Sequence, residues 1–179
     1  MKVWLVGTEN DFDYLTFKNE KELERFTDYQ FDGNKIINSW TPLKLELFKG
    51  EKRSDAPYLS PGVLVVSKKT IEVFSDLLEG AVEYLPVECD NMDYYLINVV
   101  NIVDCIDYER SEVKRFSSSG RIMKFKKFAF KDDKVGNNHI FKIPELTKGY
   151  IFVSDVLKNR ILQSKIAGIG FEEVWNSEK

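Results

Sequence analysis

The apolar residues of this chain alternate with polar ones more often than they recur at helical spacing, which predicts a structure built mainly of β-strands. Bounded apolar runs place the predicted strands at 2–6, 35–40, 62–66, 82–87, 94–100, 102–106, 122–130, 139–143, 150–153 and 169–175. The longest segments without such a pattern are 41–61 and 107–120. No stretch rich in proline, or in glycine and serine, divides the chain, so we expect a single domain over residues 1–179.

Helical spacing is clearest at 19–28, where Leu23 and Phe26 lie on one side among charged residues. Asn19 has the side chain of an N-cap, whose oxygen accepts a hydrogen bond from a free amide of the first turn. We therefore predict an exposed amphipathic helix here.

Two segments, 63–87 and 150–174, follow the same order of a buried strand, a serine, a short helix, a glycine and a second strand. Their serines, Ser67 and Ser154, stand 87 residues apart, and the same offset aligns both ends of the segments without a gap. Each serine ends a strand where an N-cap is needed, so we interpret both as capping residues and not as nucleophiles. An internal duplication explains this repeat, and so does chance, since strand-helix-strand units resemble one another.

These patterns predict an α+β fold, with a mixed, mostly antiparallel sheet, few helices and two similar strand-helix-strand units. Parallel pairing within those units is allowed, because a helical crossover returns the chain to the same sheet. The middle of the chain is expected to form a meander or hairpins.

The composition is that of an ordinary globular protein, with 43% hydrophobic and 31% charged residues. A formal net charge of -3 argues against a dedicated polybasic nucleic-acid binder. Cys89 and Cys105 form no Cys-x-x-Cys pair, which indicates free thiols in a reducing compartment. The apolar start over residues 1–6 is too short for a signal peptide, and no run approaches the roughly 20 apolar residues of a membrane helix. We therefore expect a cytoplasmic protein.

The single histidine, His139, excludes zinc sites that need two or three histidines and any two-histidine proton relay. No Gly-x-Ser-x-Gly elbow, Gly-x-Gly-x-x-Gly motif or phosphate-binding loop occurs. His139 lies in a turn that leads into a predicted strand, and we expect it to be structural. The sequence thus predicts a protein that is not an enzyme, with no metal and no cofactor.

Several short motifs occur in a fixed order along residues 38 to 175. They are Trp40-Thr41-Pro42, Val65-Val66-Ser67, Leu85-Pro86-Val87, Tyr94–Val99 with Asn98, Val103–Asp107 with Asp104 and Asp107, Ile140–Ile143 with Phe141, Ile151–Asp155 with Ser154, and Ile166–Phe171. In this order and spacing they resemble family eleven of the bacterial polymorphic-toxin immunity proteins. The sequence departs from the family pattern at Lys142, where an arginine is expected, and at Ala167, which replaces a polar residue or threonine.

The resemblance implies a cytoplasmic protein that is encoded with a toxin, binds it, and protects the producing cell or its siblings by stoichiometric inhibition. It implies neither a catalytic motif nor a membrane partner. It supplies no toxin-contact motif to transfer to this chain, and the oligomeric state stays open.

Charge is unevenly distributed along the chain. Residues 8–32 hold eight acidic and three basic side chains, whereas residues 110–134 hold nine basic and three acidic ones. The acidic segment fits a docking surface for a basic toxin, with aromatic residues as anchors. The predicted partner-binding residues are Glu9, Asp11, Asp13, Tyr14, Glu20, Glu24 and Asp28. A solvated acidic surface over a core of aromatic residues is the alternative interpretation.

Two other functions stay open. The segment 121–131 mixes cations with aromatic residues, as single-strand nucleic-acid binders do, although lysines on an edge strand also block unwanted pairing. Asp104 and Asp107 stand three residues apart at the end of a predicted strand and fit an unrecognised carboxylate site of an enzyme. Aspartates in that position more often bond to the amides of a turn.

Overall fold

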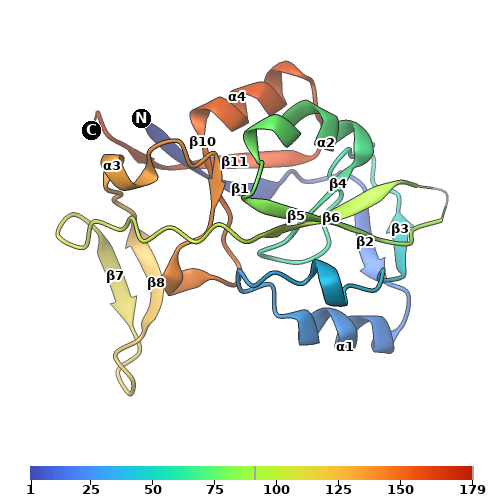
Figure 1. Cartoon of the computed structure of the whole chain (residues 1–179), viewed down its shortest axis with the longest axis horizontal. Helices are drawn as coiled ribbons and strands as arrows, with labels where there is room; N and C mark the ends of the chain where they lie inside the picture. The colour runs from blue at the N-terminus through green and yellow to red at the C-terminus, as the bar shows by residue number, and fades with distance from the viewer. Residues whose placement is uncertain (91, 179) are drawn as a thin grey trace.

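The computed structural model describes residues 1–90 and 92–178 and shows the predicted α+β architecture (Figure 1). Over these residues eleven strands pair in mostly antiparallel fashion: β1 Lys2–Thr8, β2 Tyr14–Phe17, β3 Leu45–Phe48, β4 Leu64–Ser67, β5 Val82–Pro86, β6 Tyr94–Val99, β7 Glu112–Arg115, β8 Ile122–Lys127, β9 Ile140–Phe141, β10 Phe152–Ser154 and β11 Ile169–Asn176. The helices are α1 Glu20–Tyr29, α2 Lys68–Phe74, α3 Asp132–Val135 and α4 Asp155–Gln163, with 3-10 turns at Ile37–Ser39, Ser75–Leu77 and Pro144–Leu146. Among the described residues, no helix has the length and apolarity needed to cross a membrane.

Both predicted strand-helix-strand units are present, and each encloses a third strand. The first unit, β4-α2-β5, lies in a sheet of order β4-β6-β5, and the second, β10-α4-β11, lies in a sheet of order β11-β1-β10-β9. The inserted strands, β6 and β1, run antiparallel to both of their neighbours. The outer strands of each unit are therefore parallel to each other without being paired.

Helices α2 and α4 lie side by side and cover the same face of the molecule (Figure 1). Beneath them one apolar cluster joins the two units, with Val66 and Ile97 from one sheet, Val153 from the other, and Phe74 and Leu157 from the helices. All five side chains are at most 1% exposed. The two units thus share one core.

The opposite faces of the two sheets are covered by different elements. Helix α1 and the β2–β3 pair cover the β4-β6-β5 sheet, where Val65 and Leu96 join Leu15 and Leu45. The β7–β8 pair covers the other sheet, where Phe125 joins Phe152 in an aromatic cluster. Because both faces of β4, β6 and β10 are buried, their sequences are mostly apolar and do not alternate, with Asn98 on β6 as a buried polar exception.

Each predicted N-cap is confirmed. The side chain of Asn19 accepts a hydrogen bond from the amide of Glu22 at the start of α1. Ser67 accepts from the Thr70 amide of α2, and Ser154 accepts from the Leu157 amide of α4, both at 3.3 Å. Ser154 also bonds to His139, whose ring nitrogen Nδ1 lies 2.9 Å from the serine oxygen.

The prediction of a strand at 35–40 is wrong. Residues Ile37–Ser39 form a 3-10 turn, because the amides of Ile36 and Ile37 donate to the Glu83 carboxylate on β5 instead of to a neighbouring strand. Segment 102–106 forms only isolated bridges, between Ile102 and Lys142 and between Ile106 and Phe130.

Strands β2, β3 and β7 were not predicted. Each is four residues long, which leaves too few alternating positions to reveal a period of two. Two of them, β3 and β7, lie in the segments 41–61 and 107–120 that show no clear pattern. Their pairing is decided by contacts with β2 and β8.

Candidate functional site

Among the residues predicted to bind a partner, Asp13 lies in the interior. It is 3% exposed, and its carboxylate accepts hydrogen bonds from the amides of Gly50 at 3.0 Å and Ser54 at 3.2 Å. Arg53 approaches the same carboxylate at 3.8 Å from the solvent side. Asp13 therefore holds the chain at residues 50–54 and presents no free surface.

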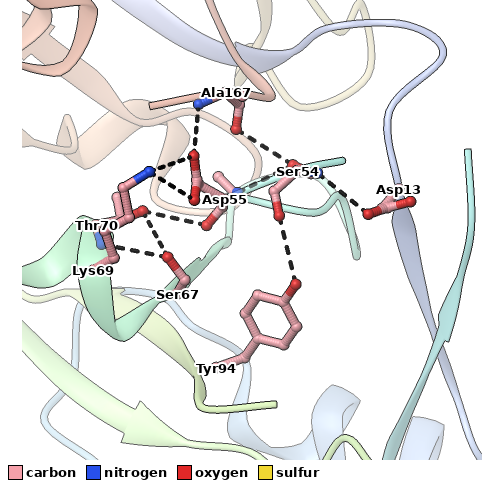
Figure 2. A network of polar contacts seen from close by, with 9 residues as sticks. Asp13, Ser54, Asp55, Ser67, Lys69, Thr70, Tyr94 and Ala167 are labelled. Atoms are coloured by element: carbon pink, nitrogen blue, oxygen red, sulfur yellow. Dashed lines mark hydrogen bonds and ion pairs between the residues drawn. The ribbon is translucent and has the colours of Figure 1, made fainter. Parts of the chain in front are cut away.

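Asp13 belongs to a polar network that connects segments distant in the sequence (Figure 2). The carboxylate of Asp55 accepts from the Ala167 amide at 3.1 Å, and its backbone oxygen accepts from the Ser67 amide at 2.8 Å and from the Thr70 hydroxyl at 3.3 Å. Lys69 donates to the same carboxylate from the rim. The network fixes the edge of β4 and the turn before β11, and the Ser67 hydroxyl joins it at 3.0 Å from the hydroxyl of Thr70.

The remaining acidic residues of the prediction are exposed. Glu20, Glu24 and Asp28 follow one another at four-residue spacing along α1, where they form one ridge. Glu9 and Asp11 lie in the connection from β1 to β2. The structure thus divides the predicted set between a helix and a loop.

Tyr14, also predicted, lies in an exposed group of three aromatic rings. Its ring stacks on Phe48 across the β2–β3 pair, with centroids 5.4 Å apart, and its backbone forms a bridge to Tyr58. Tyr14, Phe48 and Tyr58 are 44%, 45% and 41% exposed. We call these three residues the aromatic patch. Sequence reasoning missed Phe48 and Tyr58, because the strand that places Phe48 beside Tyr14 was not recognised.

Two of the residues in the family-like motifs anchor the segment between α1 and β3. Asn98 is fully buried on β6 and donates to Glu83 at 2.9 Å and to the backbone oxygen of Asn34 at 2.8 Å. The indole of Trp40 donates to the backbone oxygen of Pro86 at 2.8 Å. These contacts cover the outer edge of β5, which makes the motif residues part of the framework.

The remaining motif residues lie in the core, in connecting segments or in a turn. Phe141 is buried and stacks on Phe152, with centroids 5.6 Å apart, while Pro42 is half-buried in the chain before β3. Asp104 is exposed, and the Asp107 carboxylate accepts from the amide of Glu109 at 3.1 Å, as in an ordinary turn. Over residues 1–90 and 92–178 no group of three or more histidine, cysteine or acidic side chains is arranged to hold a metal ion.

The basic segment, residues 110–134, contains the β7–β8 pair, which projects away from helices α2 and α4 (Figure 1). One face packs on the core through Val113 and Phe125, as expected for the alternation of a strand. The exposed side chains near its turn include Phe116 at 43% and Met123 at 36%. Beside them Tyr108 donates a hydrogen bond to Glu145, and desolvation of the phenol together with this bond raises the pKa of Tyr108 to about 12.

Comparison with known protein families shows which family this chain resembles over most of its length. The model of the immunity protein family (Imm11) matches residues 17–176, from the end of β2 to the end of β11. A search among curated proteins found no match. The matched range contains both strand-helix-strand units, the segment anchored by Glu83 and Asn98, and the β7–β8 pair.

Proposed function

The chain belongs to the immunity protein family (Imm11), and we propose that it neutralises one cognate bacterial toxin by stoichiometric binding in the cytoplasm. The observation that carries this proposal is the extent of the family match, which covers residues 17–176 of 179. Inhibition by an immunity protein of this kind follows from covering the active site or another essential surface of the toxin.

The aromatic patch supports binding as the mode of action. Three exposed aromatic rings in one place are unusual on a surface that only meets water, and aromatic side chains are enriched at the centres of protein interfaces. The acidic residues Glu9 and Asp11 lie in the connection that leads to Tyr14. We propose that this region, with the α1 ridge of Glu20, Glu24 and Asp28, contacts a basic surface of the toxin.

The test uses the toxin domain encoded beside this gene. Co-expression of this protein is expected to restore growth to cells that produce the toxin domain, and calorimetry with a catalytically inactive toxin domain is expected to show one molecule bound per toxin. Failure of the wild-type protein to bind or to protect would overturn the proposal.

The contribution of the aromatic patch is tested by Tyr14→Ala and Phe48→Ala. Hot-spot aromatics lose about 2 kcal/mol or more of binding energy on truncation, a loss of about thirtyfold in affinity. Leu162→Ala is the matched control, because Leu162 is 51% exposed and lies on α4, away from the patch. Equal affinities for all three variants would show that the toxin binds elsewhere.

A further inference from the structure

The β7–β8 hairpin contains a destabilising like-charge pair for which its own fold gives no reason. Lys114 and Lys124 are directly opposite each other across the two strands, and both are exposed. Like charges in this position repel and destabilise a strand pair. Beyond the Val113–Phe125 pair, Glu112 lies opposite Lys127 and has the complementary charge that a hairpin normally selects.

Among the described residues, no ion pair within 4.0 Å offsets this repulsion. Within the described part of the chain, Lys114, Arg115, Arg121 and Lys124 form no ion pair within 4.0 Å. The Arg115 guanidinium donates to the backbone oxygen of Gly120, which holds it over the turn. The outer end of the hairpin is thus a concentrated positive surface, although the whole protein has a net charge of -3.

The same end of the hairpin offers apolar contacts. A hollow of about 520 Å³ is lined by Tyr108, Arg115, Phe116, Arg121, Ile122 and Glu145. Arginine and aromatic residues are the types enriched in protein interfaces, and lysine is depleted there. The lining therefore has the composition of an interface core, and it lies at the same end of the hairpin as the lysine pair.

We infer that the outer end of the β7–β8 hairpin is a docking surface for an acidic segment of the toxin. This inference rests on the proposed function. Carboxylates of that segment would bind Arg115 and Arg121 and relieve the repulsion between Lys114 and Lys124. The apolar side chains of Phe116 and Ile122 in the hollow favour a polypeptide, whose own apolar side chains can pack on them, over a continuous phosphate backbone.

The decisive variant is Lys114→Glu. It replaces a like-charge pair with an opposite-charge pair opposite Lys124, so the hairpin is expected to keep or raise its melting temperature. It also removes two units of positive charge from the proposed docking surface. We expect the association rate with the inactive toxin domain to fall about tenfold at low salt, and the difference to shrink at high salt. A merely structural role would change stability and binding in the same direction.

Lys68→Glu is the matched control, because this substitution changes the net charge by the same amount. Lys68 is exposed and lies in the first turn of α2. Its association rate is expected to equal that of the wild type. If Lys114→Glu binds the toxin domain as fast as the wild type, or if Lys68→Glu slows it equally, the inference is wrong while the proposed function stands. If the wild type does not bind the toxin domain, both are wrong.

A random single-stranded oligonucleotide serves as a second probe. Salt-sensitive binding of it by the wild type that Lys114→Glu abolishes, with toxin binding unchanged, would assign the hairpin to nucleic acid and overturn the inference. No change in oligonucleotide binding, together with slower toxin association, supports it.

Discussion

The ammonium group of Lys142 donates a hydrogen bond to the backbone oxygen of Phe31 across 2.5 Å, joining segments 111 residues apart in the chain. Lys142 is 1% exposed, and burial lowers its pKa to about 8, with a smaller opposing effect from the nearby charge of Asp32. This lysine stands where the family pattern suggests an arginine. The contact places an ionisable group in the interior, beneath the segment that follows α1.

The stability of the protein should therefore depend on pH through Lys142. The folded state binds this proton less tightly than the unfolded chain, whose lysine has a pKa near 10.5, so the penalty for burying the charge is full below pH 8 and fades as the pH rises toward 10.5. Relative to Lys142→Met, the wild type should gain about 2 kcal/mol of unfolding free energy between pH 7 and pH 10. Urea denaturation of both proteins at each pH measures the gain.

Lys142→Arg is the control for this effect, since a guanidinium stays charged throughout that range and keeps a donor near Phe31. Its stability relative to Lys142→Met should not change between the two pH values. A parallel gain in the arginine variant would show that another group is responsible.

Glu83→Ala should release the segment between α1 and β3. The Glu83 carboxylate, 9% exposed, accepts from the Ile36 and Ile37 amides and from Asn98, so its removal takes the acceptor from both amides and one of the two acceptors from Asn98. We expect a loss of about 2 kcal/mol or more and faster hydrogen exchange at residues 34–40. Exposed Glu79 supplies the control, and Glu79→Ala should leave exchange in this segment unchanged.

Gly168→Ala should be among the more costly substitutions outside the core. A Cβ at residue 168 would lie 2.0 Å from the hydroxyl oxygen of Ser54, within the network of Figure 2, and the backbone there has a φ of +93°. We expect a loss of at least about 2 kcal/mol, seen as a lower midpoint of urea unfolding. Gly80→Ala separates the two causes, because Gly80 has a φ of +73° with open space around its Cβ position and should cost about 1 kcal/mol. Equal losses would mean that the contact with Ser54 is unimportant.

The thiol of Cys105 should react slowly in the folded protein. It is completely buried, and burial raises its pKa from 9 to about 12, which reduces the reactive thiolate about a thousandfold at pH 8. Labelling with a thiol reagent, with Cys89→Ser used to isolate the signal, should proceed only as fast as the chain unfolds. Rapid labelling without denaturant would contradict the burial of this residue.

Local signals in the sequence are sufficient to predict the helix caps and the two strand-helix-strand units. Asn19, Ser67 and Ser154 were identified because an N-cap acts on an amide only a few residues ahead, and the apolar runs of β4, β6 and β10 are long enough to show burial on both sides. The strand expected at 35–40 failed for the opposite reason. Its amides bond to a side chain 47 residues further along, which no local pattern reveals.

The candidate binding surfaces depend on tertiary structure more than the helix caps and the two strand-helix-strand units do. The sequence by itself determined the α+β class, the two strand-helix-strand units, their caps, the family resemblance and the segregation of charge along the chain. Only the folded chain buried Asp13, brought Phe48 and Tyr58 beside Tyr14, and set Lys114 opposite Lys124. Strand register and the burial of a charge are set by contacts between distant segments, and these form only when the whole core assembles.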